Sequence, residues 1–261
     1  MFNGFLVLIL AHLLADFVFR TNNLVKGKQE LNINACGIHV FLFFLSGIFL
    51  YGIMTGLTGR IFLGLAALSV FHGLLDYLQQ VSGKLLRIRI SEVVLFIINQ
   101  ATHVLAILIF LILLHGKEGA AILTKLNRAT FAGLIGWPQK LIIVACLLIV
   151  ATSVSNTAIR LFLKPFKADT AGKLSISNEE KELKIGRYIG SAERILTVFA
   201  VLAGSYEGLL ALYASKTAIR YPKVKSEESF AEYYFLGTSV SAITGIIIGL
   251  ILKAVLLINP L

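Results

Sequence analysis

The sequence predicts an all-α protein, a polytopic bundle of about seven transmembrane helices. Three observations predict this fold class. Of the 261 residues, 57% are hydrophobic and only 15% are charged, the mean hydropathy is +0.85, and apolar runs long enough to cross a bilayer recur from end to end. Such a composition excludes a soluble globular enzyme, a secreted disulfide scaffold and a disordered chain.

The apolar runs are expected to be helices, because backbone groups that face lipid must form hydrogen bonds within their own segment. The first run is predicted to be a retained span and not a signal peptide, since no Lys or Arg precedes it. In chain order the predicted spans are 2–19, 35–54, 61–79, 93–114, 141–159, 189–214 and 233–258.

Polar segments between the runs predict how the chain is divided. The stretch 164–187 is expected to be the longest exposed loop, and 216–225 is a basic segment. We expect a four-helix domain over 1–125 and a C-terminal membrane region over 126–261 that contains both segments. Cys36 and Cys146 lie in or beside apolar runs, so no disulfide framework is expected.

The formal charge of +10 is concentrated between the apolar runs, where anionic lipid headgroups attract basic residues. Membrane lipids are therefore the expected partners, and nucleic acid is not. With seven spans, the odd-numbered connections and Lys253 carry 14 Lys and Arg, against 9 in the even-numbered ones. The positive-inside rule then places the odd connections in the cytoplasm and the N-terminus outside.

Ionisable residues recur inside the first four runs. Two runs contain a histidine followed four residues later by an aspartate, a spacing that places both side chains on one helix face. The second and fourth runs each add a histidine, and counting the rise per residue places all these groups in one half of the bilayer. The residues are His12, Asp16, His39, His72, Asp76 and His103, with Asn99 and Gln100 as candidate outer partners.

Two carboxylates at membrane depth are costly unless they are neutralised, so this layer predicts a bound cation. All six His and Asp residues are candidate ligands, and Asp16 and Asp76 are candidate catalytic bases. Imidazole with carboxylate suits zinc, with manganese or iron as alternatives. A proton or hydrogen-bond relay and purely structural polar packing are the other interpretations.

The motifs HLLADFVFRT, FHGLLDY and NQATH, with the isolated His39 between the first two, resemble the bacterial membrane family catalogued as domain of unknown function 3307. GRYIGSAERIL, GLLALYASKTAIRY and AEYYFLGTSVSAI are similar to the C-terminal half of that family. The resemblance implies a multi-pass protein of the bacterial cytoplasmic membrane. Its His-x-x-x-Asp pattern is similar to families described as membrane-bound metal-dependent hydrolases. The family often has an aspartate where this chain has Asn99.

The second half contains candidate substrate-binding residues, namely Glu193, Arg194, Glu207, Lys216 and Arg220. Adjacent helical residues point about 100° apart, so Glu193 and Arg194 are expected to find partners on other helices. Glu207 is expected to be buried, and Lys216 with Arg220 can grip a phosphate or contact anionic lipid. Gly245 and Gly249 predict close helix packing.

These patterns favour a metal-dependent hydrolase that acts on a lipid-like ester or phosphoester at the cytoplasmic membrane face. A transporter or channel for cations, protons or small solutes that uses the same layer is the alternative, and a non-enzymatic membrane component is the third. No phosphate-binding glycine loop or nucleophile elbow is present in the sequence. Homo-oligomer formation stays open.

Overall fold

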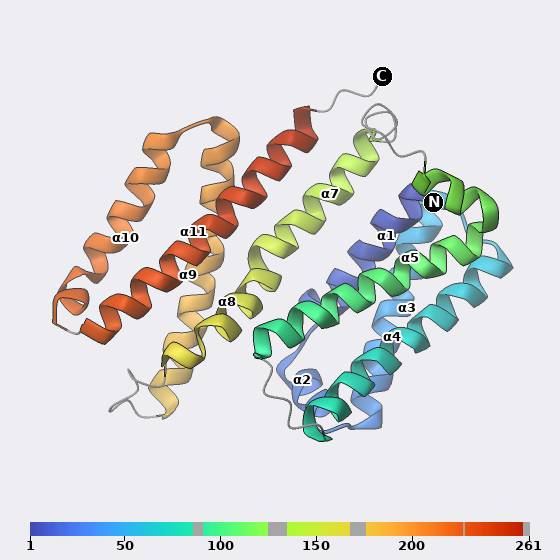
Figure 1. Cartoon of the computed structure of the whole chain (residues 1–261), viewed down its shortest axis with the longest axis horizontal. Helices are drawn as coiled ribbons and strands as arrows, with labels where there is room; N and C mark the ends of the chain where they lie inside the picture. The colour runs from blue at the N-terminus through green and yellow to red at the C-terminus, as the bar shows by residue number, and fades with distance from the viewer. Residues whose placement is uncertain (86–90, 125–134, 168–175, 227, 258–261) are drawn as a thin grey trace. The chain divides into compact units, whose positions relative to one another are not determined.

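The computed structural model describes residues 1–85, 91–124, 135–167, 176–226 and 228–257, and all regular structure there is helical. The all-α prediction is therefore confirmed for these residues. They form two compact units, 1–146 and 147–257, which are described separately (Figure 1). The elements are α1 (Phe2–Leu13), η1 (Leu14–Val18), α2 (Asn22–Gln29), α3 (Ile33–Thr55), α4 (Gly59–Leu85), α5 (Glu92–Thr124), α7 (Trp137–Ile149), η2 (Val150–Val154), α8 (Ser155–Leu163), η3 (Pro165–Lys167), α9 (Ile176–Ala203), α10 (Tyr206–Ser226) and α11 (Glu228–Leu257).

The first unit is built around a four-helix bundle. Contacts run from α1 to α3, from α3 to α4, from α4 to α5 and from α5 back to α1, so these four helices form a closed ring. Leu8, Phe43, Leu65 and Leu111, one from each helix, are at most 1% exposed and form its core. Large apolar side chains on the outside of these helices are exposed, as expected where helices face lipid.

Local capping explains where the helices of the first unit begin and end. Thr21 Oγ1 accepts from the Leu24 amide at the start of α2, and Asn32 Oδ1 accepts from two amides at the start of α3. Gly56, at φ +81°, ends α3. The π-helical turn η1 and then a 93° bend separate α1 from the short helix α2.

Five helical segments are long and apolar enough to span a membrane: Ile33–Thr55, Gly59–Val81, Glu92–Gly116, Trp137–Leu163 and Phe230–Leu257. The count becomes six if Phe2–Val18 and Asn22–Gln29 are taken together as one broken span. The described residues thus indicate a multi-pass membrane protein, but five or six candidate spans replace the predicted seven. The orientation of the chain stays a prediction.

The predicted span 189–214 is wrong, because the structure divides it into two helices. α9 ends at Ala203, Gly204 has φ +69°, and Ser205 Oγ accepts from the Gly208 amide at the start of α10. The turn lies in the sequence Gly-Ser-Tyr-Glu-Gly at 204–208, and the apolar residues on both sides of it led to the prediction of one span. The basic segment 216–225 lies within α10.

The predicted loop 164–187 is also shorter than expected. Helix α9 begins at Ile176, so the segment from there to Arg187 is helical. Its composition is rich in Glu and Lys, which are good helix formers even where the segment is too polar for a membrane core. Polarity correctly excluded a spanning helix here but did not exclude a helix.

Helix α11 packs closely on α9 in the second unit. A Cβ atom added at Gly245 would lie 2.9 Å from Thr197 Cγ2, and one at Gly249 would lie 2.8 Å from Val201 Cβ. The absence of these side chains lets the two backbones approach, which confirms the expectation from the Gly-x-x-x-Gly spacing. α8 and α10 also contact α11.

Candidate metal centre

Four of the six predicted ligands meet inside the bundle of the first unit. Asp16 comes from η1, His39 from α3, and His72 and Asp76 from α4. One possible ligand atom from each of them lies within 4.8 Å of the others. These four residues are called the His/Asp group.

The spacing of the His/Asp group resembles that of a metal coordination shell. His39 Nε2 lies 2.9 Å from His72 Nε2 and 3.1 Å from Asp76 Oδ2. Asp16 Oδ1 lies 3.2 Å from each of these two imidazole nitrogens. Donors at ordinary zinc bond lengths in a tetrahedron would be separated by about 3.3 Å, so the group needs little adjustment to hold a divalent cation.

Burial makes this arrangement costly unless both carboxylates are neutralised. His39 and His72 are 2% and 3% exposed, and both aspartate side chains are 9% exposed. Asp16 Oδ1 accepts no hydrogen bond of good geometry, although two imidazole nitrogens lie beside it. A buried carboxylate oxygen without a well-aligned donor is costly, and a bound cation would satisfy it.

Two local features bring these side chains together. The π-helical turn Leu14–Val18 contains Asp16 and holds more residues per turn than an α-helix, which changes the direction of that side chain. Gly73 leaves no space for a Cβ atom beside Val40, so α3 and α4 approach closely next to His39 and His72. Neither the π-turn nor the helix contact is evident from residue spacing.

His12 and His103 lie beside the His/Asp group but outside it. His12 Nδ1 is 3.8 Å from Asp16 Oδ1, and His12 Nε2 is 3.1 Å from Gln100 Oε1, so Gln100 contacts a ligand candidate. His103 Nδ1 pairs with the backbone oxygen of Asn99 at 2.8 Å. Its Nε2 is 3.4 Å from Asp76 Oδ1. Asn99 therefore contributes its carbonyl, and this contact does not involve its side-chain amide.

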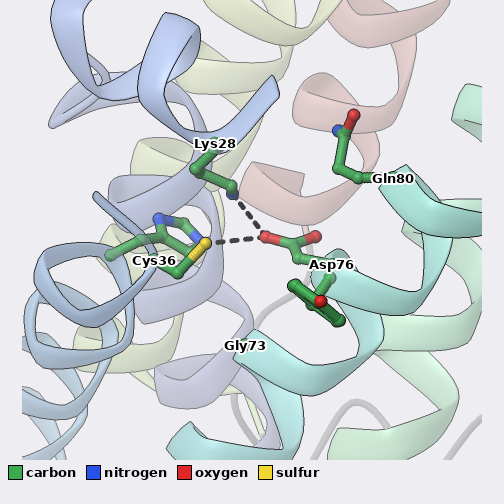
Figure 2. Close-up of a pocket in the computed structure, with 7 residues that line it drawn as sticks. Lys28, Cys36, Gly73, Asp76 and Gln80 are labelled. Atoms are coloured by element: carbon green, nitrogen blue, oxygen red, sulfur yellow. Dashed lines mark hydrogen bonds and ion pairs between the residues drawn. The ribbon is translucent and has the colours of Figure 1, made fainter. Parts of the chain in front are cut away.

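Lys28 is a site residue that the sequence analysis missed. Its ammonium group forms an ion pair with Asp76 Oδ2, and both residues line a pocket beside the His/Asp group (Figure 2). The other residues of this pocket are Cys36, His39, Gly73, Tyr77 and Gln80. The sequence shows Lys26 and Lys28 as two basic residues of one connection, and no spacing distinguishes the one that faces inward.

A second polar cluster lies in the second unit around Arg194, which is 2% exposed. Its Nε donates to the Ala151 carbonyl at 2.5 Å, its Nη1 donates to Ser241 Oγ at 2.9 Å, and its Nη2 donates to Asn156 Oδ1. The Lys216 ammonium donates to Glu193 Oε2 at 2.6 Å. The expectation that Glu193 and Arg194 find partners on other helices is confirmed.

The remaining predicted substrate-binding residues do not join this cluster. Glu207, in the first turn of α10, is exposed, so its predicted burial is wrong. Arg220 is also exposed, one turn beyond Lys216. All five predicted substrate-binding residues belong to the second unit, whereas the His/Asp group belongs to the first.

Comparison with protein families matches residues 5–131 to the family described as "Protein of unknown function (DUF3307)". Comparisons with curated proteins and with solved structures give no match. The matched range contains the whole His/Asp group, His12, His103 and Lys28, whereas the C-terminal motifs that resembled the family lie outside it. Residues 5–131 of this chain therefore belong to the DUF3307 family of proteins of unknown function.

Proposed function

We propose that this membrane protein is a metal-dependent hydrolase that acts on an ester or phosphoester of a lipid-like substrate at the cytoplasmic membrane face. The observation that carries the proposal is the His/Asp group, in which four potential ligand atoms face one another at metal-site spacing inside membrane helices. A polar group that served only helix packing would be expected to align its own hydrogen bonds, whereas Asp16 Oδ1 lies 3.2 Å from two imidazole nitrogens without a well-aligned hydrogen bond.

Asp16, His39, His72 and Asp76 would hold the metal, with zinc favoured and manganese or iron as alternatives. The metal would supply Lewis-acid chemistry for hydrolysis. His12 and His103 would fix the two carboxylates from outside the group. Of the two carboxylates, Asp76 lines the pocket, so it is the one placed to accept a proton from a water molecule there.

Metal content tests the first half of the proposal. Protein purified in detergent without chelator is expected to contain a stoichiometric divalent metal by elemental analysis. His39→Ala and His72→Ala should lose it, because each removes one of the four facing ligand atoms. His115→Ala is the matched control, since this fifth histidine pairs with the Leu111 carbonyl and lies outside the group.

Turnover tests the second half. Metal-loaded protein is expected to hydrolyse a phospholipid or lipid ester, and His72→Ala and Asp76→Asn should reduce the rate by at least about a hundredfold. His115→Ala should keep wild-type turnover. Histidine-dependent cation uptake into liposomes without turnover would contradict hydrolysis and support transport. A wild-type chain that binds no metal would contradict both.

A further inference from the structure

We propose that Lys28 neutralises Asp76 in the absence of metal, that a divalent metal displaces its ammonium group, and that the freed ammonium group then binds a phosphate group in the adjoining pocket. The inference deepens the proposed function and rests on its metal-binding half. It assigns a phosphate-bearing ligand to this pocket and names the residue that recognises it.

The first observation is that Lys28 and a metal would use the same ligand atom. Lys28 Nζ pairs with Asp76 Oδ2, the oxygen that also lies 3.1 Å from His39 Nε2 within the His/Asp group (Figure 2). A metal bound by the group would place a second cation next to the ammonium group. Like charges at such a separation repel strongly in a partly buried site.

The charges of the group lead to the same conclusion. Asp16 and Asp76 carry two negative charges when ionised, and the ammonium group of Lys28 offsets one of them. A divalent metal would neutralise both carboxylates without Lys28. The lysine charge would then be unpaired at the edge of the group, where an anion would satisfy it.

The position of Lys28 allows such an exchange. Its side chain is 20% exposed, whereas that of Asp76 is 9% exposed, so the ammonium group approaches the carboxylate from the open side of the site. Lysine presents three donors on a flexible stem and binds phosphate as a point charge. The lysine is on α2, which follows the 93° bend and projects its side chain into the pocket from outside the four-helix ring.

The chemistry of the pocket favours phosphate as the anion. Lys28 shares the lining with Tyr77 and Gln80, whose hydroxyl and amide groups can also donate hydrogen bonds to phosphate oxygens. Phosphate is the anionic group that lipid headgroups present at a membrane surface. With Lys28 paired to Asp76 the cavity encloses about 10 Å³, enough for one water molecule, so a phosphate would enter only after the lysine side chain has moved. It would then lie beside the candidate metal ligands His39 and Asp76.

The metal arm of the test measures Mn²⁺ affinity of the full-length protein by electron paramagnetic resonance. Lys28→Met is expected to bind Mn²⁺ at least tenfold more tightly than wild type, because it removes the competing cation. Lys28→Arg should resemble wild type, since it keeps the charge. Lys26→Met is the matched control, because Lys26 is exposed on the same short helix.

The phosphate arm uses the Mn²⁺-loaded protein and two probes. Inorganic phosphate binding is followed by ³¹P relaxation, and lipid binding is measured with phosphatidylcholine vesicles that contain phosphatidate. Lys28→Met is expected to weaken phosphate binding at least tenfold, whereas Lys28→Arg and Lys26→Met retain it. Binding of both probes would identify the phosphate group itself as the ligand, and binding of phosphatidate vesicles alone would identify a lipid headgroup.

The possible failures are distinguishable. If wild-type protein binds no metal, the proposed function and this inference are both overturned. If wild-type protein binds Mn²⁺ but Lys28→Met binds it no more tightly, only the exchange is overturned. Equal phosphate binding by Lys28→Met and wild type would overturn the recognition role. If the methionine variant is unstable, Lys28→Arg tests the recognition role. This variant keeps the positive charge, so loss of phosphate binding in it would contradict the proposal.

Discussion

At the scale of single residues, the histidines of the first unit separate into two kinds. His39 and His72 present Nε2 atoms to each other and to Asp16, so they are inner members of the group. His103 uses Nδ1 on a backbone carbonyl and places Nε2 beside Asp76 Oδ1, and His12 contacts Gln100. The inner pair would bind the metal, whereas the outer pair would orient its carboxylates.

Metal titration of single variants would separate these roles. His39→Ala is expected to abolish stoichiometric binding, since it deletes an atom within 3.2 Å of three other potential ligands. His103→Ala should retain one metal with affinity reduced about 10- to 100-fold, the usual effect of losing an outer partner. The dissociation constant is measured by calorimetry, and equal losses in both variants would place His103 in the coordination shell.

Residue spacing predicted part of this arrangement. The four-residue interval between His72 and Asp76 correctly placed both side chains in the group on one face of α4. It could not reveal Lys28, because a lysine between two spans is common and its direction depends on the bend before α2. Nor could it show that Arg194 bonds to carbonyls, since those oxygens belong to the π-helical region η2.

At the scale of elements, the contact between α3 and α4 determines whether the inner histidines meet. A Cβ atom at Gly73 would overlap Val40, so this glycine permits the two helices to approach next to His39 and His72. Close packing of membrane helices commonly depends on such small residues. The glycine is therefore expected to affect both packing and metal binding.

Gly73→Ala should lower the free energy of unfolding of the detergent-solubilised protein by about 1–3 kcal/mol, the usual cost of an overpacked contact. A lower melting temperature would show this loss. The substitution should also weaken metal binding, because α3 and α4 would have to separate. Gly37→Ala is the matched control on α3, where a Cβ atom would meet no neighbour within 4 Å. Loss of stability and affinity in the Gly37 variant as well would show that the effect does not arise from the α3–α4 contact.

At the scale of the whole molecule, the sequence predicted most of the spanning segments and misjudged the total. Long apolar runs were sufficient for the helices that include His39, His72 and His103, because length and composition alone distinguish a spanning helix. They were not sufficient at Gly204, where a glycine with positive φ divides an apolar stretch. Gly204 and Ser205 are residue types that are common in turns and helix caps, but the apolar runs on both sides favoured a single span.

Cysteine labelling would test the arrangement of the first unit in the membrane. In a chain whose two native cysteines are replaced by alanine, Glu30→Cys and Leu57→Cys should react with an impermeant maleimide from opposite sides. The span Ile33–Thr55 lies between these two exposed positions. The positive-inside rule predicts that position 30 is cytoplasmic. Reaction of both positions from one side would show that α3 does not cross.

Both π-helical turns in the described part of the chain lie next to buried polar side chains, η1 at Asp16 and η2 at the carbonyl that Arg194 contacts. A π-turn accommodates one residue more than an α-helical turn, so it shifts the angular phase of everything on one side by about 100° relative to the other. Deletion of a single residue within 14–18 would restore regular winding and swing His12 away from Gln100. The number of residues in the segment 14–18 is thus a structural constraint of its own. A homologue could keep the histidine and the aspartate of the motif and still lose the relative orientation of their side chains.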